Sequence, residues 1–522
     1  TGMPLAGGGS TAHVDTFARD RLPPRELWPE MGCPNLPELE SYPHRLNAAG
    51  ALLDAAVARG WGSRTAVRYG ALAWSYRDLQ EKTDRVARVL AEDMGLKPGE
   101  RVLLRSPNTP MMAAAWLAVL KAGGIAVATM PLLRAREVAV ILERAQVSHA
   151  LCSVDTREAL EQARGGSPLL RHVALFTADG EASRPEADLD CAMKSKPAAP
   201  FPAVDTAADD PALIAFTSGT TGRPKGCVHF HRDVLAVCDA FPRYVFGARM
   251  DDVYTGTPPL AFVYGLGGLL LFPLRYGACT AFPTERATPD VLLRTVAEQR
   301  CTTLFSSPAM YRSLAEAAGS FDLGSLQKCV SAGETLPAAT FESFRKATGL
   351  RVIDGIGSTE LLHMFVASAG DAIRPGATGR AIPGYEVRVA DEEGRTVPPG
   401  ELGQIAVRGF TGCRYLDDEE RQRAYVRDGW NYPGDVYRRD ADGYFWYQAR
   451  ADDMIISAGY NIAGPEVEAA LLDHPRVREC AVVAAADPVR GTIVKAFVVL
   501  REREGAGEGL VRELQDFVKR EI

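Results

Sequence analysis

The sequence lacks the features of a membrane, secreted or nucleic-acid-binding protein. No stretch of roughly 18 apolar residues occurs, and the longest candidate, residues 111–133, is interrupted by Lys121 and a glycine pair. That segment is more typical of a buried helix, a turn and a strand. The net charge of −7 offers no basic surface for nucleic acid or an anionic membrane. The first residues also lack the charged and then apolar pattern of a signal peptide.

Paired cysteines are also missing. The ten cysteines are scattered singly without a Cys-x-x-Cys motif, which argues against a disulfide framework and a structural zinc site. Free cysteines are typical of a reducing cytosol, so a cytoplasmic location is expected. His229 and His231 would share one face of a strand, but no third ligand of suitable spacing accompanies them. A metal site at these histidines is therefore not expected.

The length and periodicity of the chain predict an α/β protein with at least two domains. A chain of 522 residues is too long for one hydrophobic core. From about Leu46 helical and strand patterns alternate, which favours parallel sheets covered by helices. After Gly379 an alternation of apolar and polar residues predicts an antiparallel region, and a small final unit begins near Asp453. The expected fold is a large N-terminal domain of parallel βα subdomains with an antiparallel region, followed by a small α+β C-terminal domain.

One loop in the middle of the chain is suited to bind phosphate. The stretch FTSGTTGRPKG, residues 216–226, follows an apolar run and combines glycines, hydroxylated residues and Lys225. Glycines allow close approach of the backbone, while hydroxyls and a mobile ammonium bind phosphate oxygens. The spacing is not that of the Walker loop, because Pro224 follows Gly219 by five residues and no Ser or Thr follows the lysine. Taken alone, such a loop is equally compatible with a mobile surface turn that binds nothing.

Four motifs in a fixed order give the chain a family resemblance. TSGTTGRPKG (217–226) resembles the phosphate-binding signature of the adenylate-forming enzymes, which include acyl- and aryl-CoA ligases, adenylation domains of peptide synthetases and luciferases. GSTE (357–360), YPGD (432–435) and ARADDMIISAGYNIAGPEVE (449–468) resemble later signatures of the same family. The resemblance covers nearly the whole chain from about Leu46 onward.

Two further stretches indicate a subgroup. PPLAFVYGLGGLLLFPLRYGA (258–278) and DGIGSTELLHMF (354–365) are most similar to those of benzoate-CoA and 2-aminobenzoate-CoA ligases. The resemblance implies that a carboxylate attacks the α-phosphorus of ATP, and that the thiol of coenzyme A then displaces AMP from the acyl-adenylate. The expected cofactors are ATP and Mg²⁺, with coenzyme A as co-substrate and an aromatic carboxylic acid as substrate. Because acid and ATP are both anionic, the site must neutralise charge locally.

The resemblance also assigns roles to individual residues. Lys225, Thr359 and Glu360 are expected to be catalytic, with Lys225 on the phosphates, Thr359 on the α-phosphate and Glu360 as the Mg²⁺ ligand. Asp435 is expected to bind the ribose hydroxyls and Arg450 the ribose and phosphate, although a surface ion pair is the alternative for these two residues. The expected ATP-binding residues are Thr217, Ser218, Gly219, Thr220, Thr221, Gly222, Lys225, Ser331, Gly333, Glu334, Asp354, Gly355, Ile356, Gly357, Thr359, Asp435 and Arg450.

A flat aromatic acid requires an apolar slot with few polar contacts. By resemblance, this slot is expected to draw on Phe262, Tyr264, Gly265, Gly333, Ile356 and His363. The glycines at 265, 333 and 355 are expected to bring the backbone close to the aromatic ring of the substrate. His363 lies three residues after Glu360, so it could face the substrate or could equally be a packing histidine on a helix.

The C-terminal part departs from the family pattern. The family has a catalytic lysine in a Gly-Lys loop near its C-terminus, and this sequence contains no such loop. Lys519 and Lys495 are poor substitutes, so the last unit is expected to be incomplete. The resemblance implies a mobile C-terminal domain that rotates about Asp452 and brings Gly459 near the path of the CoA thiol. The expected domains are therefore 1–451 and 452–522.

Two alternatives remain open at this point. The chain could be a stand-alone adenylation domain that loads an aryl group onto a carrier protein, because the first half-reaction is the same. It could also be a non-catalytic nucleotide-binding module, which only the missing lysine favours. No nucleic acid or membrane partner is expected, and the sequence leaves open whether the protein is a monomer or a homodimer.

Overall fold

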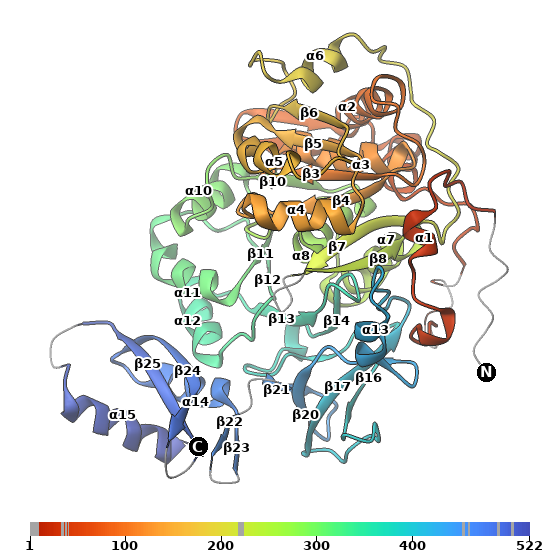
Figure 1. The fold of residues 1–522 in the computed structure, drawn as a ribbon. Coiled ribbons are helices and arrows are strands. Elements are labelled where there is room, and N and C mark those ends of the chain that lie inside the picture. Colours follow the sequence, from red (N-terminus) through yellow and green to blue (C-terminus); the bar gives the residue numbers. More distant parts are fainter. Residues whose placement is uncertain are drawn as a thin grey trace.

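The computed structural model of the chain describes residues 10–32, 36, 39, 41–217, 224–451, 455–457, 460–487, 491–502 and 506–521. Three large sheets and a small C-terminal region make up the fold (Figure 1). No helix in the described residues is long and apolar enough to cross a membrane.

The first sheet has the strand order β6-β5-β3-β4-β7-β8 and is parallel except for the last pair. Its central strand is buried throughout because helices cover it, as expected for a parallel sheet. Thr109 begins one of these helices by accepting the backbone N–H of Met112 at 3.1 Å, and every residue of that helix is buried. The strands are β3 (Arg101–Arg105), β4 (Ile125–Thr129), β5 (His149–Ser153), β6 (His172–Phe176), β7 (Pro211–Thr217) and β8 (Lys225–Phe230); the helices are α2 (Tyr76–Arg88), α3 (Pro110–Lys121), α4 (Ala135–Arg144), α5 (Arg157–Arg164), α6 (Asp188–Lys194) and α7 (His231–Asp239).

The second sheet has the order β15-β14-β13-β12-β11-β9-β10-β1-β2. Its strands from β13 to β1 run parallel, and both edges end in antiparallel strands. The strands are β1 (Thr65–Tyr69), β2 (Leu72–Ser75), β9 (Val253–Gly256), β10 (Cys279–Phe282), β11 (Thr303–Ser306), β12 (Lys328–Ser331), β13 (Val352–Gly357), β14 (Met364–Ala367) and β15 (Arg380–Ala381); the helices are α8 (Val263–Leu266), α9 (Phe272–Tyr276), α10 (Pro289–Gln299), α11 (Pro308–Ala317) and α12 (Ala338–Thr348).

The third sheet confirms the antiparallel region expected after Gly379. Its strands pair in the order β18-β19-β17-β20-β21, and β16 also pairs with β17. These strands are β16 (Tyr385–Ala390), β17 (Leu402–Gly409), β18 (Val426–Arg427), β19 (Trp430–Asn431), β20 (Asp435–Arg439) and β21 (Phe445–Arg450), with α13 (Glu419–Tyr425) beside them.

The C-terminal region is small and has its own apolar cluster. In it, Val467 and Leu471 of α14 pack with Leu510 and Leu514 of α15. In Figure 1 this region lies at the lower left, next to α12. Its elements are β22 (Ile455–Ser457), β23 (Tyr460–Ile462), α14 (Gly464–Asp473), β24 (Val477–Asp487), β25 (Gly491–Leu500) and α15 (Glu508–Glu521). The predicted fold class is confirmed by this arrangement.

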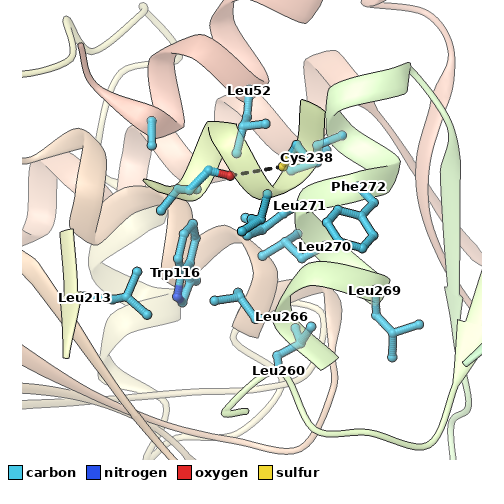
Figure 2. Close-up of a cluster of buried hydrophobic side chains, with 14 of the residues drawn as sticks. Leu52, Trp116, Leu213, Cys238, Leu260, Leu266, Leu269, Leu270, Leu271 and Phe272 are labelled. Atoms are coloured by element: carbon cyan, nitrogen blue, oxygen red, sulfur yellow. Dashed lines mark hydrogen bonds between the residues drawn. The ribbon is translucent and has the colours of Figure 1, made fainter. Parts of the chain in front are cut away.

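The largest core joins the first two sheets. Figure 2 shows Trp116 of α3 among leucines that come from separate segments of the chain, including Leu213 of β7 and Leu266 of α8. Cys238 of α7 donates its thiol to the carbonyl of Val234 at 3.1 Å, so this cysteine packs as a small buried residue.

The two histidines considered as metal ligands lie on different elements. His229 belongs to β8 and His231 begins α7, so they do not share the face of one strand. No group of three potential His, Cys, Asp or Glu ligands occurs among the described residues.

Candidate active site

A cavity of about 780 Å³ lies where the second and third sheets meet the C-terminal region. It opens beside the carboxyl ends of β12 and β13, and this edge of a parallel sheet is a common place for ligands. From the C-terminal region, Glu466, Glu468 and Leu472 of α14 contribute to the wall. The cavity brings together these residues predicted to bind ATP: Gly333, Glu334, Asp354, Gly355, Ile356, Gly357, Asp435 and Arg450.

The three glycines predicted near the substrate ring, Gly265, Gly333 and Gly355, are favoured for different reasons. Gly333 has a φ of 92°, and a Cβ on it would meet nothing within 4 Å, so its conformation alone favours glycine. A Cβ on Gly355 would lie 2.5 Å from Sδ of Met364, and one on Gly265 would lie 2.1 Å from the carbonyl oxygen of Pro259. Packing within the protein therefore favours glycine at 265 and 355, and the place of these glycines beside a substrate ring stays a prediction.

Asp354 is a buried carboxylate in the cavity wall. Its Oδ2 accepts the backbone N–H of Leu336 at 3.5 Å, and Oδ1 has no hydrogen-bond partner among the described residues. Burial raises the pKa of Asp354 well above its usual value. The carboxyl therefore keeps its proton at pH values where an exposed aspartate has lost it, and it can act as a donor as well as an acceptor.

Asp435 and Arg450 form an ion pair in the cavity wall. They are directly opposed on β20 and β21, and Nη1 of Arg450 lies 3.2 Å from Oδ1 of Asp435. The same guanidinium donates to the carbonyl of Pro433 at 3.0 Å. Burial raises the pKa of Asp435 although Arg450 acts to lower it. The ion pair considered as an alternative is thus present, and both of its members line the cavity.

The three residues expected to be catalytic lie together at the start of β8 and the end of β13. The ammonium of Lys225 lies 5.9 Å from the ring centre of Tyr415, and the hydroxyl of Tyr415 donates to Oε1 of Glu360 at 2.6 Å. The carbonyl of Thr359 accepts Nε2–H of His229 at 2.7 Å. The sequence patterns gave no indication of Tyr415 and suggested His229 only as a metal ligand, because neither residue carries a local signal of this contact.

The environment of Glu360 fits a bound cation. The side chain is almost completely buried, and burial raises its pKa, with Cys227 acting in the same direction. The hydrogen bond from Tyr415 and the charge of Lys225 act to lower that pKa. Since the described residues hold no cluster of three ligands, Mg²⁺ here would be held by Glu360 together with phosphate oxygens, as is usual for Mg²⁺ with nucleotides.

Part of the predicted phosphate loop lies outside the described residues, namely Ser218, Gly219, Thr220, Thr221 and Gly222. Its ends are described, and Thr217 of β7 pairs with Lys225 of β8 in an antiparallel register. Ser331 ends β12 and is fully buried, and it does not line the cavity.

Four of the six residues predicted to bind the acid are not in the cavity wall: Phe262, Tyr264, Gly265 and His363. Tyr264 is held by its hydroxyl, which donates to the carbonyls of Ser306 at 3.1 Å and Val330 at 2.9 Å. His363 is buried with its ring edge-on to Phe272, 4.6 Å between ring centres, and burial lowers its pKa to about 3. His363 lies in a bend of the segment that connects β13 to β14, and not on a helix.

The hinge and CoA-path residues of the sequence prediction, Asp452 and Gly459, lie outside the described residues. Lys519 is on α15, exposed and 3.8 Å from the carboxylate of Asp516. Lys495 is on β25 with its ammonium 4.8 Å from the ring centre of Phe497.

The family is decided by comparison with known proteins. Residues 54–414 match the AMP-binding enzyme family, and residues 466–522 match the AMP-binding enzyme C-terminal domain. This chain belongs to the AMP-binding enzyme family. The predicted adenylate-forming family is confirmed, and ATP, Mg²⁺ and coenzyme A are confirmed as its cofactors and co-substrate. The predicted boundary after residue 451 falls between the two matched ranges and stays a prediction.

Several relatives are similar over most of their length. The benzoate–CoA ligase of Thauera aromatica is 31% identical over 489 residues, which cover 93% of this chain and 92% of that protein. An uncharacterized acyl–CoA ligase of Bacillus subtilis is 34% identical over 457 residues, covering 86% of this chain and 84% of that protein. Among solved structures, the anthranilate CoA ligase AuaEII in complex with anthranoyl-AMP is 30% identical with a TM-score of 0.87, covering 93% of this chain and 92% of that one.

Proposed function

We propose that this chain is an AMP-forming aryl–CoA ligase that activates benzoate, 2-aminobenzoate or a closely related acid. The observation that carries the proposal is the cavity, because one wall collects residues from separate predicted nucleotide motifs, Gly333–Glu334, Asp354–Gly357, Asp435 and Arg450. These residues are far apart in sequence, so their meeting at one cavity supports a common ligand.

In the first half-reaction, ATP would lie in the cavity with its ribose at Asp435 and its adenine along residues 354–357. The phosphates would extend toward Lys225 and the turn that bears Thr359 and Glu360. Mg²⁺ held by Glu360 would neutralise phosphate charge. The carboxylate oxygen of the acid attacks the α-phosphorus, the bond to the pyrophosphate breaks, and pyrophosphate leaves with its electron pair.

In the second half-reaction, the sulfur of coenzyme A attacks the carbonyl carbon of the acyl-adenylate. The bond between that carbon and the bridging oxygen breaks, and AMP leaves carrying an oxygen atom that came from the acid. The thiol proton is lost to solvent or to a base that the described residues do not identify. The thioester is then the product, and the net reaction releases AMP and pyrophosphate.

The aryl preference is supported by two kinds of observation. The benzoate–CoA and anthranilate CoA ligases named above are similar over more than nine-tenths of this chain. The segment 258–278 is also similar to those of benzoate-CoA ligases, and its residues Tyr264 and Phe272 pack in an aromatic cluster with Phe305 and His363. In this cluster the hydroxyl of Tyr264 is already used by backbone carbonyls, so only aromatic and apolar groups are offered to a neighbouring ligand.

A panel of acids tests the proposal. The full-length protein is incubated with ATP, Mg²⁺ and CoA, and AMP release is compared for benzoate, 2-aminobenzoate, acetate and octanoate. We expect the two aromatic acids to give the fastest release, and omission of CoA to leave only a slow reaction that accumulates the adenylate. A clear preference for octanoate would contradict the aryl assignment. Absence of AMP with every acid would contradict ligase function.

A further inference from the structure

The turn that carries Thr359 and Glu360 has a conformation that its own sequence does not favour. Leu362 has a φ of 68°, in the left-handed region that a leucine rarely adopts. Its backbone N–H donates to the carbonyl of Thr359 at 3.2 Å, which closes the turn. A strained residue of this kind persists only where surrounding contacts determine its conformation. The neighbours that hold this turn are therefore informative.

His229 holds the turn from the side of β8. Its ring is fully buried and donates Nε2–H to the carbonyl of Thr359 at 2.7 Å. Nδ1 lies 3.9 Å from Oδ2 of Asp233, and that carboxylate is fixed by Arg414 at 2.9 Å. Asp233 lies near Nδ1 without a hydrogen bond, and the bond from Nε2 to the carbonyl of Thr359 orients the buried ring.

Tyr415 holds the turn from the other side. Its hydroxyl donates to Oε1 of Glu360, and the ammonium of Lys225 lies over its ring. The backbone of Tyr415 pairs with that of Cys227 on β8, the strand that also carries Lys225 and His229. One strand and one partner segment therefore fix both the backbone of Thr359 and the carboxylate of Glu360.

We propose that His229 and Tyr415 are positioning residues that set the affinity of the site for Mg²⁺ with ATP by fixing Thr359 and Glu360. The inference rests on the proposed function, since the ligands are those proposed above. Neither side chain touches the reacting atoms in this scheme, and neither transfers a proton. His229 acts through the carbonyl of Thr359, and Tyr415 acts through the carboxylate of Glu360.

Three variants test the contact of Tyr415 with Glu360 and that of His229 with Thr359 independently. Tyr415→Phe keeps the ring under Lys225 and removes the hydrogen bond to Glu360. His229→Leu removes the donor to Thr359, whereas His229→Gln supplies an N–H donor again. Binding of Mn²⁺, used as the probe for Mg²⁺, is measured calorimetrically in the presence of a non-hydrolysable ATP analogue. We expect about 10- to 100-fold weaker Mn²⁺ binding in Tyr415→Phe, as for loss of a hydrogen bond to a charged group, a smaller loss in His229→Leu, and partial recovery in His229→Gln.

Two controls remove similar buried hydrogen bonds elsewhere. The hydroxyl of Tyr76 donates to the carbonyls of Pro273 and Ala278, and Nε2 of His149 bonds the carbonyl of Met94 at 3.0 Å. Tyr76→Phe and His149→Gln should lower the melting temperature without changing Mn²⁺ affinity. The inference also predicts a kinetic effect. KM for ATP should rise in Tyr415→Phe and His229→Leu, while KM for CoA, measured with supplied benzoyl-AMP, should not change.

The outcomes are distinct. If Tyr415→Phe and His229→Leu bind Mn²⁺ with the affinity of the unmodified protein and only melt earlier, the two residues are structural and the inference is wrong. If Mn²⁺ binding is weakened equally in His229→Gln and His229→Leu, the Nε2–H donor of His229 does not have the proposed positioning role. Failure of the unmodified protein to bind Mn²⁺ with the ATP analogue would overturn the proposed function itself, and the inference with it.

Discussion

At the scale of single residues, existing contacts determine what each side chain can offer a ligand. Tyr264 has its hydroxyl bound to two backbone carbonyls, so it can present only its ring. Burial lowers the pKa of His363 to about 3, which favours its neutral form. Lys225, in contrast, makes no ion pair with the described residues, and its ammonium lies 5.9 Å from the ring centre of Tyr415. Its charge is therefore available to phosphate.

Lys225→Ala should raise KM for ATP and lower kcat/KM about 10- to 100-fold, because one charge-assisted contact to phosphate is lost. The melting temperature should change little, since the side chain is only partly buried and is outside the core. Steady-state AMP release at varied ATP measures the effect, and Lys495→Ala on β25 is the control. ATP kinetics equal to those of the unmodified protein would show that Lys225 does not bind the phosphates.

Asp354→Asn should change how stability depends on pH. The pKa of Asp354 is raised in the folded protein, so its proton is bound more tightly there than in the unfolded chain, whose value is 3.8. Its contribution to stability is complete below that value and is lost as pH rises through the raised pKa. The asparagine variant should therefore gain in melting temperature relative to aspartate as the pH increases above about 4. A difference that is constant from pH 4 to 9 would contradict the raised pKa.

At the scale of helices and strands, the periodicity of the sequence predicted the sheets, but the sequence did not predict side-chain contacts between distant segments. The alternation of helix and strand and the change of pattern after Gly379 gave the parallel and antiparallel sheets correctly, because both depend on local burial. The motifs also placed Gly333, Asp354, Asp435 and Arg450 at one cavity. The contacts of His229 with Thr359 and of Tyr415 with Glu360 could not be predicted, since they join residues 130 and 55 positions apart.

Gly265→Ala tests the packing at the start of α8. A Cβ there would lie 2.1 Å from the carbonyl oxygen of Pro259 and 2.6 Å from that of Pro258, so the backbone has to move. We expect a loss of about 1–3 kcal/mol in the free energy of unfolding, measured with urea. Gly319→Ala is the control, because a Cβ there meets nothing within 4 Å. Equal stability of both variants would contradict the packing requirement.

At the scale of the whole molecule, the cavity wall combines the large N-terminal part with α14 of the C-terminal region. Glu466 and Glu468 of α14 lie near the cavity that also holds the ion pair of Asp435 and Arg450. A change in the position of the C-terminal region would therefore change the wall of the site. This is consistent with the hinge predicted at Asp452, which lies outside the described residues and stays a prediction.

Asp452→Pro should separate the two half-reactions. Proline fixes φ near −65° and removes a backbone donor, so rotation at this position is restricted. We expect the variant to retain one half-reaction and lose most of the other. Adenylation is followed by benzoate-dependent exchange of pyrophosphate into ATP, and thioester formation by supplied benzoyl-AMP with CoA. Equal loss or full retention of both activities would contradict a hinge at Asp452.

The most direct test of the account follows the oxygen atoms of the acid. Benzoate labelled with heavy oxygen in its carboxylate is converted in the presence of ATP, Mg²⁺ and CoA, and the AMP is analysed by mass spectrometry. If the carboxylate attacks the α-phosphorus and CoA then cleaves the carbon–oxygen bond, each AMP carries one heavy oxygen from benzoate. AMP without the label, or label found in inorganic phosphate instead, would contradict an acyl-adenylate intermediate and with it the central claim.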